Sequence, residues 1–98
     1  MSENDWWVTA GLTYDRIQRG VGDANTAPEL IDSMAELADV HRQSAIAFGA
    51  SLHALLAGGT TWTEIADRLG AADQEEARAL GAEPMRLAEA ALRSRLGG

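Results

Sequence analysis

The sequence has no cysteine, which excludes disulfide bonds, Cys-ligated zinc, iron–sulfur clusters and a thiol nucleophile. Basic residues are scarce, since 8 Lys and Arg stand against 15 Asp and Glu and give a net charge of −7. Proteins that coat nucleic acid or anionic lipid carry surplus positive charge, so this acidity argues against both. No segment approaches the ~20 apolar residues of a membrane span. The acidic start Met1–Asp5 lacks the features of a secretory signal, and we expect a cytoplasmic protein.

The chain is instead rich in helix-forming residues and has the length of one domain. Of its 98 residues, 19 are Ala and 11 are Leu. No stretch alternates at period two with the β-branched residues that are typical of a strand. We therefore predict a single all-α domain over residues 1–98, a bundle of about five helices.

The first helix is predicted over residues 5–18, with a loop over residues 20–25 after it. Spacings of three and four put one set of apolar residues on a single helical face. This predicted core-facing set is Trp6, Ala10, Tyr14 and Ile17.

A long helix is predicted over residues 27–57. The segment Thr26-Ala27-Pro28-Glu29 has the pattern of a capping box, and Gly58-Gly59 has that of a helix end. The predicted core-facing row is Leu30, Met34, Leu37, His41, Ala45, Phe48, Leu52 and Leu55. One such helix would be ~46 Å long, whereas a compact domain of this size has a radius of gyration of ~13 Å. Either the helix breaks near Gly49, or it projects and needs a partner.

Three shorter helices complete the prediction. One begins at the capping box Thr61-Trp62-Thr63-Glu64 and stops at Gly70. A fourth begins at Asp73, with Glu76 completing a second capping pattern, and reaches Gly81. The last follows Pro84 and runs to Leu96.

The order of helix, short turn and helix over about residues 61–81 is that of a helix-turn-helix unit. The segment from Leu55 to Gly70 contains Gly-Thr-Thr-Trp-Thr-Glu-Ile-Ala-Asp-Arg-Leu-Gly. It resembles helix-turn-helix segments of small actinobacterial regulators, and Ala-rich, Lys-free composition is typical of GC-rich genomes. The resemblance covers about a quarter of the chain. Small Ala66 suits a close helix crossing, Ile65 and Leu69 are predicted to face the core, and Gly70 suits the turn.

The resemblance implies a transcription regulator that binds DNA as a dimer and inserts helix 73–80 into a major groove. Gln74 lies where that family has a base-reading Gln. The DNA-contacting residues that it implies are Thr61, Thr63, Arg68, Gln74 and Arg78. The dimer would form through the long helix or the N-terminal tryptophans.

The family's serine cap and its arginine are replaced here by Ala72 and Asp73, and acids follow at Glu75 and Glu76. An acidic recognition helix opposes phosphate binding, because non-specific DNA affinity comes from cations. The alternative is therefore a protein–protein interaction module such as an antirepressor, an anti-activator or a DNA mimic. Its candidate interface residues are Trp6, Trp7, Asp73, Glu75 and Glu76.

Nothing in the sequence indicates an enzyme. His41 and His53 lie twelve residues apart, whereas metal-binding histidines on a helix are three or four apart. The serines lack a nucleophile-elbow context. We expect no catalytic residue, no cofactor and no bound metal.

Overall fold

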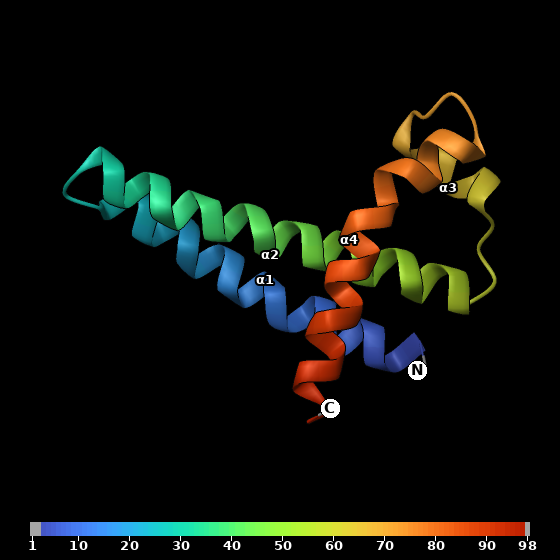
Figure 1. The fold of residues 1–98 in the computed structure, drawn as a ribbon, viewed down its shortest axis with the longest axis horizontal. Coiled ribbons are helices and arrows are strands. Elements are labelled where there is room, and N and C mark those ends of the chain that lie inside the picture. The colour runs from blue at the N-terminus through green and yellow to red at the C-terminus, as the bar shows by residue number, and fades with distance from the viewer. Residues whose placement is uncertain (1–2, 98) are drawn as a thin grey trace.

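The computed structural model describes residues 3–97 and consists of four helices (Figure 1). Helix α1 spans Glu3–Thr26, α2 spans Leu30–Ala57, α3 spans Trp62–Leu69 and α4 spans Gln74–Arg95. No strand occurs within residues 3–97. The all-α prediction is confirmed, whereas the prediction of about five helices is wrong by one.

Helices α1 and α2 form a long antiparallel hairpin that α4 crosses, and α3 lies beside the N-terminal half of α4 (Figure 1). The molecule measures 45 × 35 × 17 Å, so the hairpin projects beyond the crossing. Small residues line the contact between α1 and α2. At Gly20, for example, an added Cβ would lie 2.5 Å from Cγ2 of Val40. The two helix backbones therefore approach closely.

The predicted loop over residues 20–25 is wrong, because α1 continues without interruption to Thr26. Gly20 and Ala24 are buried against α2, and this packing outweighs the low helix propensity of glycine. The predicted face is only partly right. Trp6 and Ala10 are buried, Tyr14 is exposed, and the buried stripe continues instead through Thr13.

The predicted start of the long helix is also wrong. The N-cap of α2 is Glu29, whose side chain makes no capping hydrogen bond. Thr26 instead belongs to the last turn of α1, where its hydroxyl donates to the carbonyl of Gly22 at 3.0 Å. The predicted capping box is therefore not used, and the hairpin turn occupies residues 27–29.

Helix α2 is continuous, so of the two alternatives for this segment the break near Gly49 does not occur and the helix projects. Gly49 has another role, because it is where α4 crosses. A Cβ added there would overlap the carbonyl oxygen of Pro84 and lie 2.7 Å from the amide nitrogen of Met85. Glycine thus allows the backbones of α2 and α4 to touch.

The fourth and fifth predicted helices are one helix, α4, which passes through Gly81 and Pro84. Gly81 does not end the helix, since its missing side chain makes room for Leu52, whose Cδ1 would lie 2.7 Å from an added Cβ. The crossing of α1, α2 and α4 forms the core. Its buried members are Trp6, Ala10, Ala50, Ala54, Ala88 and Leu92.

Candidate functional site

Local hydrogen bonds define the unit formed by α3 and the start of α4, residues 61–81. The Thr61 hydroxyl accepts from the amide of Glu64 at 3.2 Å and caps α3. Gly70 ends α3 with φ of 70°, a left-handed conformation that favours glycine. The Asp73 carboxylate then accepts from the amide of Glu76 at 2.8 Å and caps α4. The starts and the stop predicted from the sequence are thus observed here.

Packing inside the α3–α4 unit differs from the prediction in one residue. Ile65, Ala66 and Ala77 are buried. Leu69 is predicted to face the core, but it is 39% exposed. Helix α3 packs mainly on α4 rather than on the hairpin, and this leaves the outer side of α3 uncovered.

Three of the five implied DNA-contacting residues form a chain on the surface of this unit. The side-chain amide of Gln74 donates to the Thr63 hydroxyl at 2.7 Å. Arg78 donates to the other end of that amide at 3.5 Å, and its guanidinium lies 5.8 Å from the ring centre of Trp62, a cation–π contact. Arg68 is exposed on α3 and does not join this chain.

The acidic residues of the α3–α4 unit partly serve its fold. Asp73 caps α4, and the Glu76 carboxylate reaches back to accept from the amide of Ala72 at 2.8 Å. Carboxylates in the first turn of a helix also interact favourably with its dipole. Glu75 is exposed beside them. Their negative charge therefore remains on the surface that the resemblance assigns to DNA.

The two N-terminal tryptophans have different surroundings. Trp6 is only 4% exposed and stacks on His53, with ring centres 4.0 Å apart and an interplanar angle of 11°. Nε2 of His53 lies 3.2 Å from the carbonyl oxygen of Met85 and 3.2 Å from a carboxylate oxygen of Glu89. Trp7 is 57% exposed. Trp7 is therefore the accessible member of the pair.

A second surface was not predicted from the sequence. Leu30, Ile31, Met34 and Leu37 lie on the projecting part of α2 and are 51–84% exposed. We call these four residues the α2 apolar surface. The prediction that Leu30, Met34 and Leu37 face the core is wrong, because all three are more than half exposed. Helix α4 crosses α2 at Gly49, about 18 Å along the helix from Leu37, and does not reach them.

The predicted core-facing row of α2 continues from this surface towards the crossing with α4, where its residues become buried. Phe48 is half-buried beside Pro84 and Leu87 of α4, and Leu52 is buried. Helix α4 thus covers Phe48 and Leu52 but leaves the start of the row, Leu30 to Leu37, uncovered. Periodicity in the sequence shows that α2 has an apolar stripe, but the position of α4 decides how much of that stripe is buried.

Metal-ligating groups, membrane spans and similarity to known proteins do not point to a further site within residues 3–97. Within residues 3–97, no group of three His, Cys, Asp or Glu side chains is placed to hold a metal ion. No helix of this part of the chain is both long enough and apolar enough to cross a bilayer. A scan against protein-family models gave no match, and neither a search of curated proteins nor one of solved structures found a similar chain.

Proposed function

We propose that this chain is a cytoplasmic, non-enzymatic regulatory module that works by binding protein through its helical surfaces. The observation that carries this proposal is the α2 apolar surface, whose four residues are at least half exposed at the projecting end of the hairpin. Contiguous exposed apolar residues are typical of interaction sites, because leaving them in water costs free energy that a partner can recover.

The occupant that we propose for the α2 apolar surface is a second copy of the chain. A compact monomer of this mass should expose about 5,400 Å². The chain exposes 6267 Å², which is about 900 Å² more. Each partner in a standard protein interface buries about 800 Å². Pairing of α2 with α2 about a twofold axis would cover the same residues in both copies, as an isologous dimer requires.

The acidic face of the α3–α4 unit then remains free in the dimer. Asp73, Glu75 and Glu76 are exposed at the start of α4. A basic protein surface complements this charge, which supports an antirepressor, an anti-activator or a DNA mimic as the kind of regulator.

The dimer is tested with the double variant Leu30→Glu plus Met34→Glu. Wild-type protein is expected to approach twice the chain mass of 10.4 kDa as its concentration rises. The dissociation constant of the double variant should be about a hundredfold higher or more. Each copy loses two apolar side chains that the interface would bury and gains two negative charges, which makes four in the dimer. Analytical ultracentrifugation across a wide concentration range measures the dissociation constant.

Ala57→Glu is the matched control for this experiment. Ala57 is exposed at the opposite end of α2, about 30 Å along the helix from Leu37. This variant should dimerise like wild type. Wild-type protein that stays monomeric at every concentration, or a loss of dimer in Ala57→Glu equal to that in the double variant, contradicts the proposed interface.

The second candidate function is DNA binding by the α3–α4 unit, as in a helix-turn-helix transcription regulator. It is supported by the short turn at Gly70 and by the exposed chain of Thr63, Gln74 and Arg78. These side chains can donate to base edges or phosphates, and Thr61 and Arg68 flank them. The acids at the start of α4 oppose the same contacts.

A titration of labelled duplex DNA at about 50 mM salt separates the two candidates. We expect no binding, because the carboxylates of Asp73, Glu75 and Glu76 repel the phosphates. DNA regulation instead requires binding with a salt slope that falls by about one for each phosphate-contacting arginine removed, in Arg68→Ala and in Arg78→Ala. Observing that pattern would establish the second candidate and reject the charge argument against it.

A further inference from the structure

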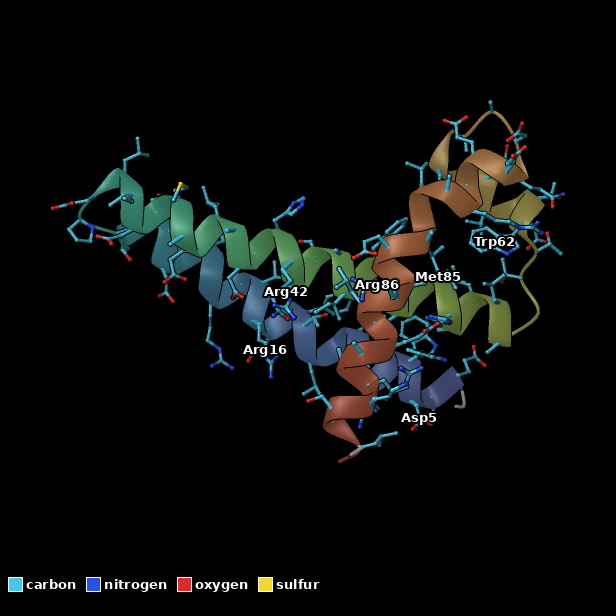
Figure 2. The ribbon with its side chains drawn as sticks, viewed as in Figure 1. Asp5, Arg16, Arg42, Trp62, Met85 and Arg86 are labelled. Atoms are coloured by element: carbon cyan, nitrogen blue, oxygen red, sulfur yellow. The ribbon has the colours of Figure 1, made fainter. Side chains whose placement is uncertain are left out.

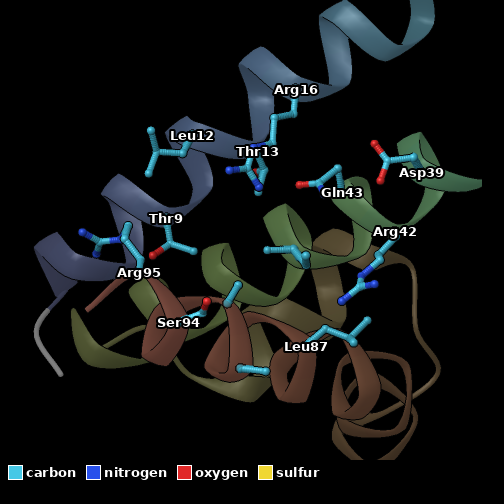
Figure 3. Close-up of a pocket in the computed structure, with 13 residues that line it drawn as sticks. Thr9, Leu12, Thr13, Arg16, Asp39, Arg42, Gln43, Leu87, Ser94 and Arg95 are labelled. Carbon is cyan, nitrogen blue, oxygen red and sulfur yellow. The ribbon is translucent and has the colours of Figure 1, made fainter. Parts of the chain in front are cut away.

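A cavity of about 400 Å³ lies where α1, α2 and α4 meet, on the side of the hairpin away from the α3–α4 unit (Figures 2 and 3). Its volume is within the range of small-molecule sites, about 300–1,000 Å³. Thr9, Thr13 and Gln43 are buried polar residues in its lining, and Leu12 and Leu87 provide apolar walls. The cavity is separate from the α2 apolar surface.

Three arginines line this cavity, one from each helix: Arg16 of α1, Arg42 of α2 and Arg95 of α4. They are three of the eight basic residues in a chain whose net charge is −7. Within residues 3–97 none of the three forms an ion pair, and Arg95 donates only to the backbone carbonyl of Asp5, at 3.3 Å. Asp39 is the one carboxylate in the described lining. The cavity is therefore a local concentration of positive charge.

A buried acceptor also belongs to the lining of this cavity. Gln43 is only 8% exposed, and its side-chain oxygen Oε1 has no hydrogen-bond partner among the described residues. Figure 3 shows Gln43 between Thr13 and Asp39, with the Arg42 side chain directed towards Leu87. The neighbouring threonine hydroxyls donate to backbone carbonyls and not to Oε1 of Gln43. Thr13 donates to the carbonyl of Ala10 at 2.6 Å, and Thr9 donates to that of Asp5 at 2.9 Å. A buried acceptor without a donor is costly, so this oxygen favours a ligand that brings one.

We propose that this cavity binds a small organic acid that carries a hydrogen-bond donor next to its carboxylate and a short apolar body. Arg16 and Arg42 pair with the carboxylate, and guanidinium is well suited to this because it can donate two parallel hydrogen bonds. The donor meets Oε1 of Gln43, and the apolar body packs on Leu12 and Leu87. The ligand contacts α1, α2 and α4 together and so stabilises their crossing.

Mandelate and phenylacetate form a matched pair of probes for this site. Both carry a carboxylate and a phenyl ring, but only mandelate has a hydroxyl beside the carboxylate. We expect both to bind wild-type protein at low salt, with mandelate about tenfold tighter because its hydroxyl donates to Gln43. Calorimetry measures the two affinities, and thermal unfolding should show a melting temperature that rises with mandelate concentration.

Variants at Arg42 and Gln43 test which side chains contact the two acids. Arg42→Gln should weaken both acids about tenfold or more, whereas Arg68→Gln on α3 should change neither and is the matched control. Gln43→Met should remove the preference for mandelate while keeping phenylacetate binding. The ligand comparison on wild-type protein and the Arg42 variant remain decisive even where Gln43→Met fails to fold.

Three outcomes overturn the proposal. The first is that neither acid binds wild-type protein. The second is that Arg68→Gln weakens binding as much as Arg42→Gln, which makes the interaction non-specific. The third is that wild-type protein binds both acids equally, which removes the role of Gln43. None of these outcomes bears on the α2 dimer, whose residues lie outside the cavity.

Discussion

Replacing Trp6 with alanine is expected to lower the free energy of unfolding by about 3–5 kcal/mol, the range for deleting a buried large aromatic side chain. Trp6 is 4% exposed and belongs to the core at the crossing of α1, α2 and α4. The variant also loses the stacking of the Trp6 ring on His53. A domain of this size has a total stability of about 5–15 kcal/mol, so the variant should be marginally folded at room temperature.

Trp7→Ala provides the comparison for this experiment. Trp7 is the next residue, yet it is 57% exposed, and we expect its replacement to change stability by less than about 0.5 kcal/mol. Thermal and urea unfolding followed by circular dichroism measure both variants. Equal losses in the two variants would show that the burial assigned to Trp6 is wrong. A change in self-association in Trp7→Ala alone would add Trp7 to the interaction surface.

Replacing Gly49 with alanine is expected to destabilise the chain although alanine is the better helix former. The added methyl group overlaps the backbone carbonyl of Pro84, and backbone in a packed helix cannot rotate aside as a side chain can. The steric cost is about 3 kcal/mol or more, against a gain in helix propensity of about 1 kcal/mol. The net loss of about 2 kcal/mol should lower the melting temperature by about 8–16 °C.

Gly11→Ala is the matched control. Gly11 also lies inside a long helix, and a Cβ added there has no atom within 4 Å. This variant should raise stability by about 0.5–1 kcal/mol, because only the propensity term acts. A Gly49→Ala protein that melts at or above wild type would contradict the close crossing of α2 and α4.

Charges of opposite sign are concentrated at different places on the molecule. Negative residues are exposed on the α3–α4 unit, at Asp73, Glu75 and Glu76, whereas Arg16 and Arg42 line the cavity beside the hairpin. The net charge of −7 is therefore not spread evenly over the molecule. Three of the eight basic residues line the cavity where three helices meet, whereas Arg78 is the one basic residue of the predicted recognition helix 73–80.

Local chemistry in the sequence was sufficient for the two helix starts and the one stop between α3 and α4. Thr61 and Asp73 cap their helices through bonds to amides three residues ahead, and Gly70 ends α3 by its own backbone conformation. Such interactions depend only on residues a few positions apart. The same kind of signal failed at Thr26, because packing of α1 on α2 extended the first helix to Thr26 and placed this residue in its last turn.

The sequence by itself determined that the chain is all-helical, where α3 begins and ends, and where α2 ends. These features depend on propensity and capping, which act over three or four residues. Only the tertiary structure decided that Trp6 rather than Trp7 is buried, that Gly49 and Gly81 are crossing points and not helix ends, and that the α2 apolar surface is uncovered. It also brought Arg16, Arg42 and Arg95, from three helices, to the lining of one cavity. Burial and clustering of this kind depend on where a distant helix comes to lie, and periodicity along one helix carries no information about the position of another.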